Sequence, residues 1–160
     1  MRSGVTTSVR LIVIPLVLLC AGCAGALSQR YPSRPPAAMT ATQAEQDERA
    51  CVATAKRATV ERAWAYIGCM VSKEHTVGVA FRVRNETTYF DVTQTRPHDP
   101  PVIASELNEC RRVAYTAGRE AGPTREGMVD RMESAFRACA DPRGYVVRPQ
   151  GEAIPNRPPR

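Results

Sequence analysis

The chain has 160 residues, of which 43% are hydrophobic, so one small domain is expected rather than a large multidomain enzyme. Lysine and arginine outnumber aspartate and glutamate by 22 to 16, but no positive run or aromatic-interleaved basic strand occurs, which disfavours nucleic-acid binding. Aromatic residues make up only 6%, and a core this small usually needs cross-links or partners.

The N-terminal segment has the pattern of an export signal. Arg2 and Arg10 precede the apolar run "LIVIPLVLL" of residues 11–19. A membrane-spanning helix needs roughly 20 apolar residues, whereas the apolar region of a signal peptide needs about 7–15. Small residues follow the run and suit a protease that reads an extended chain. We therefore expect residues 1–22 to be a signal peptide, whose removal lowers the net charge from +6 to +4.

The end of this segment, Ala21-Gly22-Cys23, resembles the lipobox of bacterial membrane lipoproteins, in which two small residues precede a lipid-bearing cysteine. Cys20 stands where the family usually has leucine. The resemblance implies that Cys23 carries a diacylglycerol and an N-linked acyl chain such as palmitate. It also implies a lipid-anchored envelope protein, and Ala24 after the cysteine implies the outer membrane, facing the periplasm, rather than the inner membrane.

Two other interpretations of the N-terminus remain open. An ordinary signal peptide cut after Ala26 would release a soluble periplasmic protein, because Ala24-Gly25-Ala26 offers a small-x-small site. An uncleaved anchor is the other alternative. A redox Cys-x-x-Cys pair is disfavoured because no strand–helix context surrounds Cys20 and Cys23.

Proline-rich segments flank the expected domain. Residues 23–41 contain Pro32, Pro35 and Pro36 among small and polar neighbours, which predicts an extended tether without a buried face. Residues 149–160 have a similar composition, and we expect a disordered tail. The folded domain is therefore assigned to residues 42–148.

The first half of this domain predicts two helices. Thr42 and Glu45 have the spacing of a capping box, with the helix continuing to about Ala58. Thr59 is a plausible second N-cap, followed by "VERAWAYIGCMV", which is apolar on most sides and is expected to be buried. Trp64 and Met70 in this stretch are interpreted as core residues.

The hydrophobic period then changes from that of a helix to that of a strand. Val77, Val79, Phe81 and Val83 alternate with small or basic residues, which predicts a strand. A turn at Asn85-Glu86 and the returning segment "TTYFDVT" complete a β-hairpin.

A second helical pair follows the hairpin. Its first helix is expected to end near Gly118 or Gly122, and Thr124 caps its second, which ends at Asp141-Pro142. The expected buried stripes are Leu107, Cys110, Ala114 and Ala117, and then Met128, Met132, Ala135, Phe136 and Cys139. The fold class is therefore α+β and mainly helical, with two helical hairpins and a β-hairpin between them.

The two halves, residues 42–98 and 99–148, resemble each other. Aligning Cys69 with Cys139 matches "AYIGCMVSKEHTV" to "AFRACADPRGYVV", and Cys51 then corresponds to Cys110, with a longer helix–helix loop in the second half. Four cysteines in an exported domain predict disulfides, and sequence alone allows three pairings. An internal duplication favours Cys51–Cys69 and Cys110–Cys139, each inside its own hairpin.

No motif for catalysis, cofactor or metal binding is present. His75 and His98 have no second ligand at helical or turn spacing, so both are interpreted as packing or surface residues. Glu106 and Glu109 are expected on a solvated helix face. Phosphate-binding, nucleophile-elbow, zinc-protease and haem-attachment motifs are missing from the sequence. We therefore expect no catalytic residue and no cofactor.

These observations together predict a non-enzymatic envelope lipoprotein that acts as a binding or assembly accessory module. Its expected partners are the lipid bilayer, reached through the acylated cysteine, and an envelope protein or anionic envelope surface. The alternative functions are an envelope enzyme or enzyme inhibitor, with a site that forms only in three dimensions, and a soluble periplasmic protein.

Overall fold

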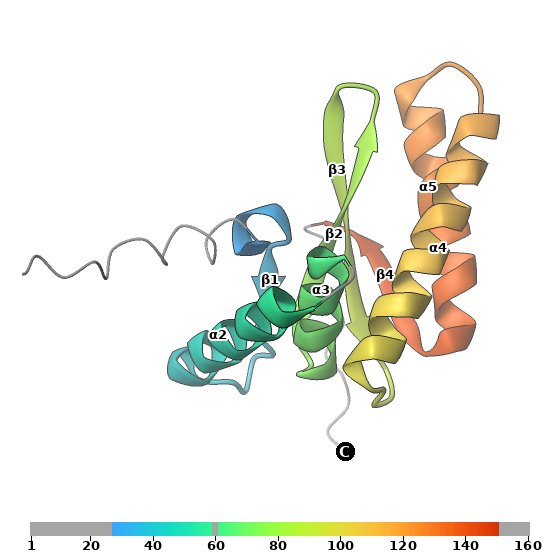
Figure 1. Ribbon diagram of the computed structural model, residues 1–160. Helices are drawn as coiled ribbons and strands as arrows, with labels where there is room; N and C mark the ends of the chain where they lie inside the picture. The colour runs from blue at the N-terminus through green and yellow to red at the C-terminus, as the bar shows by residue number, and fades with distance from the viewer. Residues whose placement is uncertain (1–26, 59–60, 151–160) are drawn as a thin grey trace, which may run out of the picture.

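The computed structural model describes residues 27–58 and 61–150. Cys23, the expected signal peptide, Thr59 and residues 151–160 lie outside this part. The described chain is α+β, as expected, and Figure 1 shows its elements. In chain order they are β1 (Ser33–Arg34), α2 (Ala41–Arg57), α3 (Arg62–Ser72), β2 (Thr76–Val83), β3 (Glu86–Gln94), α4 (Pro100–Glu120), α5 (Arg125–Ala140), a 3-10 turn (Asp141–Arg143) and β4 (Tyr145–Pro149).

The four strands form one antiparallel sheet in the order β1-β2-β3-β4. Helices α3 and α5 contact its strands, and α4 packs against both helices, so one face of the sheet is covered (Figure 1). The predicted alternation is confirmed, because Val77, Val79, Phe81 and Val83 are at most 1% exposed. Phe81 meets Phe90 and Phe136 edge-to-face, with ring centroids 4.9 and 5.1 Å apart.

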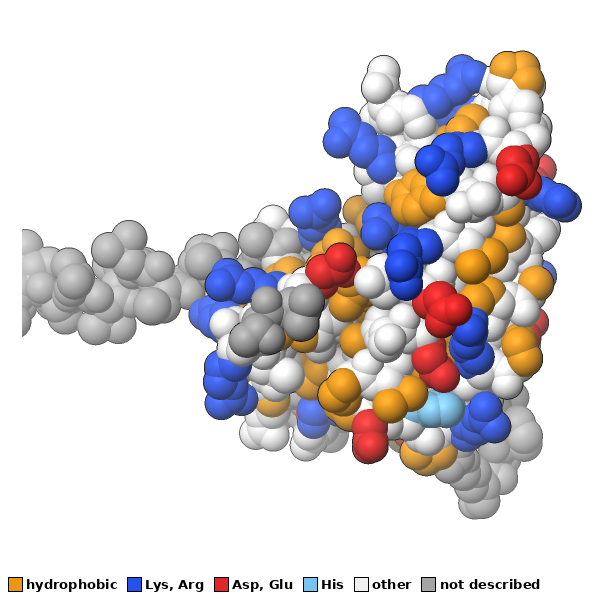
Figure 2. Space-filling model, turned by 45° about the vertical axis from the view of Figure 1, so that its right-hand side comes forward, with side chains coloured by type: hydrophobic (Ala, Val, Ile, Leu, Met, Phe, Trp, Pro, Cys, Tyr) orange, Lys and Arg blue, Asp and Glu red, His pale blue; other side chains and the backbone are white. Residues whose placement is uncertain are grey.

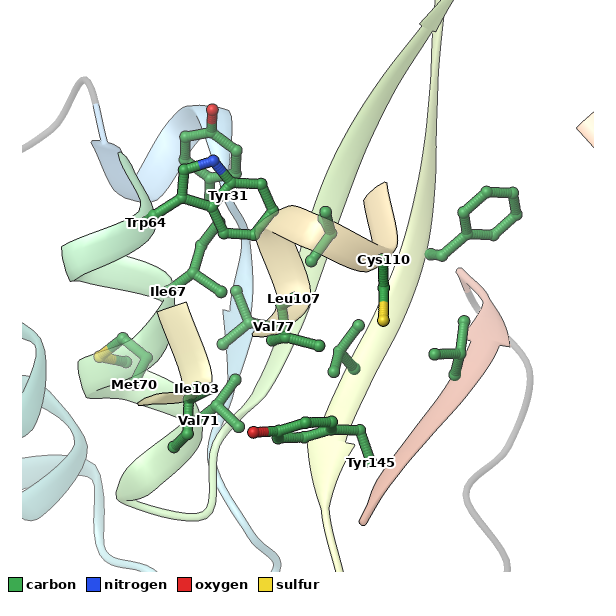
Figure 3. Close-up of a cluster of buried hydrophobic side chains, with 14 of the residues drawn as sticks. Tyr31, Trp64, Ile67, Met70, Val71, Val77, Ile103, Leu107, Cys110 and Tyr145 are labelled. Carbon is green, nitrogen blue, oxygen red and sulfur yellow. The ribbon is translucent and has the colours of Figure 1, made fainter. Parts of the chain in front are cut away.

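Trp64 and Met70 lie in the core, as expected, at 7% and 0% exposure (Figure 3). Their helix can approach α4 closely because Gly68 has no side chain. A Cβ atom there would lie 2.3 Å from the Pro100 carbonyl oxygen. The packing of α3 on α4 therefore depends on a glycine.

The helix starts agree only in part with the prediction. Thr124 caps α5 as expected, its hydroxyl accepting from the Gly127 amide at 3.2 Å. The predicted capping box of Thr42 is wrong, since Thr40 is the N-cap of α2 and accepts from the Gln43 amide at 3.2 Å. Thr40 has extended backbone angles, so the helix begins two residues earlier than expected.

Part of the expected tether belongs to the fold. Tyr31 is only 8% exposed, β1 pairs with the edge of β2, and the Gly78 amide donates to the Pro32 carbonyl at 2.7 Å. At the other end, β4 continues to Pro149, and the Gln150 amide donates to the Tyr89 carbonyl at 3.2 Å. Proline is compatible with such edge positions, where it interrupts no central ladder. The fold thus extends beyond residues 42–148.

Both disulfides have the pairing that the repeat favoured. Cys51–Cys69 joins α2 to α3 and Cys110–Cys139 joins α4 to α5, each with a Cα–Cα distance of 5.4 Å. The expectation of a longer loop in the second half is wrong, since residues 58–61 and 121–124 connect the two pairs. The additional residues lie in the helices, because α4 has 21 residues against 17 in α2, and α5 has 16 against 11 in α3.

The strands after the hairpins repeat the same arrangement. Val77 of β2 and Val147 of β4 are both register partners of Val92 in β3. The strands β2 and β4 therefore run parallel to each other on either side of β3. Before each of them the backbone is left-handed, at Glu74 with φ 66° and at Gly144 with φ 89°. These correspondences support the internal duplication.

Candidate functional site

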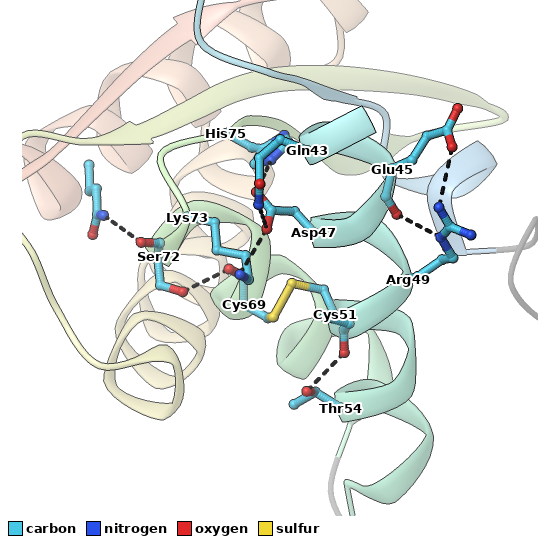
Figure 4. Close-up of polar contacts among 12 residues, drawn as sticks. Gln43, Glu45, Asp47, Arg49, Cys51, Thr54, Cys69, Ser72, Lys73 and His75 are labelled. Carbon is cyan, nitrogen blue, oxygen red and sulfur yellow. Dashed lines mark hydrogen bonds and ion pairs between the residues drawn. A yellow bond between two sulfur atoms is a disulfide. The ribbon is translucent and has the colours of Figure 1, made fainter. Parts of the chain in front are cut away.

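A buried polar cluster lies beside the first disulfide (Figure 4). The Asp47 carboxylate, only 4% exposed, accepts hydrogen bonds from Lys73 Nζ at 2.9 Å and Gln43 Nε2 at 3.1 Å. His75 Nε2 lies 3.3 Å from its other oxygen. The cluster joins the start of α2 to the turn that follows α3, so it fixes the open ends of the first hairpin.

The protonation of Asp47 reflects this environment. Burial alone would raise the pKa of the carboxyl, but the hydrogen bonds from Lys73, His75 and Gln43 outweigh it and hold the pKa below the usual value. His75 is 1% exposed, and its Nδ1 has no hydrogen-bond partner among the described residues. The Asp47 carboxylate and the His75 imidazole are both enclosed, and their contacts hold the start of α2 against the turn after α3.

The second half carries an equivalent contact. Tyr145 donates its hydroxyl proton to Glu106 Oε2 at 2.5 Å, and burial together with this carboxylate raises the pKa of Tyr145. His98 lies against the Tyr145 ring, with centroids 5.5 Å apart. The expected solvated face is therefore wrong for Glu106, which is half-buried, whereas Glu109 is 52% exposed and forms an ion pair with Arg143.

Arg111 connects α4 to the sheet in a way that the sequence did not indicate. Its guanidinium carbon lies 5.7, 5.7 and 5.0 Å from the ring centroids of Trp64, Phe81 and Tyr115. Its Nε donates to the Ala80 carbonyl at 3.1 Å. Cation–π contacts with three rings and a hydrogen bond to the sheet backbone thus hold the Arg111 guanidinium in place, and they help to pack α4 against the sheet.

A groove of about 600 Å³ opens where α2 ends and where α3 and α4 begin. Its apolar wall consists of Trp64, Ala65, Pro100, Pro101 and Ala104, and its polar rim includes Arg57, Glu61, Ser105 and Asn108. Asn108 Nδ2 donates to Glu61 Oε2 at 3.1 Å, which ties one end of the rim together. A concave apolar wall with a few polar groups is the usual form of a binding site. The groove is therefore the candidate functional site.

The groove combines residues from both halves of the fold. Alignment of the halves cannot reveal it, because it forms where the two units meet. The apolar character of "AWAYIG" and the Pro100-Pro101 helix start were visible in the sequence, but nothing there indicated that the two segments lie together.

The remaining features considered from the sequence are a metal site, a membrane-spanning helix and the site cysteines. Within residues 27–58 and 61–150, no three histidine, cysteine, aspartate or glutamate side chains are grouped closely enough to hold a metal ion. In the same ranges, no helix combines the length and apolar character needed to cross a membrane. Cys23 lies outside the described residues, and the four other expected site cysteines all lie in disulfides.

No protein-family model matches the chain, and no curated protein or solved structure matches it either. Function is therefore inferred from the residues and their geometry alone.

Proposed function

We propose that this protein is a lipid-anchored, non-enzymatic binding or assembly module of the bacterial cell envelope. One observation carries the proposal: a domain with two disulfides includes Leu27, which packs against its core four residues after the lipobox-like Cys23. Disulfides form and persist in oxidising compartments such as the periplasm. They therefore support export, and the lipobox-like segment supports acylation of the exported chain.

The spacing determines how the module would sit on its membrane. Four extended residues span at most about 14 Å, so a lipid on Cys23 would hold Leu27 within that reach of its own attachment point. Two acyl chains or more provide stable anchoring, which one chain does not. The proposed role is thus performed close to the membrane surface rather than at the end of a long tether.

The groove is the surface that we assign to partner binding. Figure 2 shows small groups of hydrophobic side chains on the face in view, some of them in a row down its right-hand side, with charged side chains beside them. Among the described residues, the large hydrophobic side chains that are well exposed are Val102 and Val113, at 43% and 45%. Scattered residues of this kind do not make a docking patch. A protein partner with a small apolar element would instead fit the Trp64 wall, with Arg57 and Glu61 at the rim to orient it.

Acylation is tested with Cys23→Ser in the full-length chain, and Cys20→Ser is the matched control. We expect Cys23→Ser to leave the detergent phase or to accumulate as uncut precursor, while Cys20→Ser partitions like wild type. Mass spectrometry of the N-terminal peptide should show the lipid on Cys23. Wild-type partitioning and migration of Cys23→Ser would contradict the anchoring proposal.

Binding at the groove is tested with a photo-crosslinking residue at Ser105 in intact cells. The control position is Thr116, which is exposed on α4 and absent from the groove lining. We expect a discrete envelope adduct from position 105, which Ala65→Arg abolishes, and none from position 116. The same adducts from both positions, or none from position 105, would argue against the groove as the binding surface.

A further inference from the structure

The guanidinium of Arg143 lies directly on the second disulfide. Its Nη1 is 2.8 Å from Cys110 Sγ and also contacts Cys139 Sγ, while the same nitrogen donates to the Cys139 carbonyl at 3.3 Å. Nη2 forms an ion pair with Glu109 Oε1 at 3.2 Å. A fixed positive charge therefore faces both sulfur atoms of this bond.

Within residues 27–58 and 61–150, no charged side chain makes a hydrogen bond to the sulfur atoms of the first disulfide. Lys73 is the equivalent of Arg143, four residues after the second cysteine of its hairpin, but its ammonium group pairs with Asp47 at 2.9 Å. The two disulfides also differ in exposure. Cys51 and Cys110 are 0% exposed and Cys69 is 7% exposed, whereas Cys139 lies in the partly exposed range.

These two differences affect the same reaction, thiol–disulfide exchange. The rate of exchange depends on access to the attacked sulfur, and it increases when the leaving thiol has a low pKa. A neighbouring arginine stabilises a thiolate and lowers the pKa of its thiol. In the second disulfide, Cys139 is therefore the more exposed cysteine, and Arg143 stabilises the leaving thiolate of Cys110.

We propose that Cys110–Cys139 is a thiol–disulfide exchange site for a dithiol reductant, and that Cys51–Cys69 is purely structural. A thiolate of the dithiol attacks Cys139 Sγ and forms a mixed disulfide. The Cys110–Cys139 bond breaks, and its electron pair stays on Cys110 Sγ as a thiolate beside Arg143. The second thiol of the reductant, after losing its proton, attacks the mixed disulfide and releases Cys139 as a thiolate.

The net reaction is balanced by the dithiol alone. The protein disulfide gains two electrons and two protons and becomes two thiols, while the dithiol loses the same and becomes a disulfide. The reverse reaction reoxidises the pair. The proposal does not depend on lipid anchoring, because it concerns only residues of the folded domain.

Glu109 forms an ion pair with Arg143, which weakens the stabilisation of the Cys110 thiolate by the guanidinium but does not abolish it. It is 52% exposed, so water screens its attraction for the guanidinium. The Arg143 Nη1 that faces the sulfur atoms is not the nitrogen that pairs with Glu109. The nearby Glu106 carboxylate is engaged by Tyr145.

The test follows both disulfides in one folded protein. The oxidised domain is treated with limiting dithiothreitol, quenched with a thiol-alkylating reagent and mapped by peptide mass spectrometry over time. We expect Cys110 and Cys139 to be alkylated at least about tenfold faster than Cys51 and Cys69. Arg143→Gln should slow reduction of the second disulfide about three- to tenfold and leave the first unchanged.

Two controls keep the result interpretable. Arg137→Gln removes an arginine at the end of α5, one that pairs with Glu133 and not with a disulfide, and should change neither rate. Glu109→Gln removes the competing carboxylate and should maintain or increase the rate at the second disulfide. Loss of structure in Arg143→Gln would accelerate reduction, so a slower rate has the opposite sign from unfolding. Equal rates for the two disulfides, or an unchanged or faster rate in Arg143→Gln, would overturn the proposal.

Discussion

The His75 imidazole and the Tyr145 phenol occupy equivalent positions in the two halves of the fold, and each is 1% exposed. Each ring lies six residues after the second cysteine of its hairpin. Each also faces a carboxylate four residues before the first cysteine, Asp47 in one half and Glu106 in the other. The chemical groups have changed between the halves, but a ring–carboxylate contact still closes each stapled hairpin.

The contact in the second half should be measurable as a coupling energy. Tyr145→Phe removes the donor and leaves the half-buried Glu106 carboxylate without it, which should cost about 1–2 kcal/mol of unfolding free energy. Glu106→Gln and the double variant complete a cycle measured by denaturant unfolding, and we expect about 1 kcal/mol of coupling. Purely additive effects would show that the two side chains do not stabilise each other.

The contact in the first half should make stability dependent on pH. The pKa of Asp47 is lower in the folded state than in the unfolded chain, so the unfolded chain binds the proton more tightly. The free energy of unfolding therefore increases with pH between the folded-state pKa and the unfolded-state pKa of this carboxyl. Asp47→Asn should cost about 2 kcal/mol near neutral pH. The difference from wild type should shrink as the pH falls below about 4 and through the folded pKa. Thermal unfolding of both proteins from pH 7 to pH 3 measures this, and a constant difference would refute it.

The two disulfides should contribute similar stability although their chemistry differs. Their sequence separations are 18 and 29, for which the chain-entropy model gives about 3 and about 4 kcal/mol. Cys51→Ser/Cys69→Ser and Cys110→Ser/Cys139→Ser should each lose free energy of unfolding on this scale. Guanidinium titrations of the two double variants measure it, and a variant as stable as wild type would exclude a structural role for its bond.

Gly68 and Gly118 provide a matched pair of helix substitutions. Alanine is normally the better helix former by about 1 kcal/mol. In Gly68→Ala the new Cβ meets the backbone oxygen of Pro100, so we expect a net loss of about 2 kcal/mol. In Gly118→Ala the close contact is with the side chain of Met132, while the Met128 carbonyl lies at an ordinary 3.4 Å. A methionine side chain adapts more readily than backbone, so the loss should be smaller. Melting temperatures in the reverse order would contradict this account of α3–α4 packing.

The features that the sequence could predict are those that depend on periodic burial and on the repeat. Alternation at Val77, Val79 and Phe81 identified β2, and the cysteine positions in two similar segments selected the disulfide pairing. Both signals are properties of side chains at regular spacing, which local sequence records directly. The start of α2 was misplaced because two threonines, Thr40 and Thr42, could each serve as the cap.

The features that the sequence could not predict are contacts between backbone atoms and contacts between segments that lie far apart along the chain. β1 joins the sheet through main-chain pairing of Ser33 and Arg34, which leaves no hydrophobic pattern. The position of Arg143 on a disulfide depends on how the 3-10 turn follows α5. One sequence signal for the ring–carboxylate contacts was available. His75 and Tyr145 each lie six residues after the second cysteine of their hairpin, and Asp47 and Glu106 each lie four residues before the first.

Among the residues that the structure describes, strand β3 has no counterpart in the second half, and both halves pair with it. Since β2 and β4 each pair with β3 and not with each other, a polypeptide of residues 99–150 would contain one stapled hairpin and a strand with nothing to pair with. Such a fragment should gain ordered sheet only when a second fragment supplies β3. The protein is thus suited to fragment complementation, with a division between Gln94 and Pro100 and reassembly detected by the return of a cooperative melting transition.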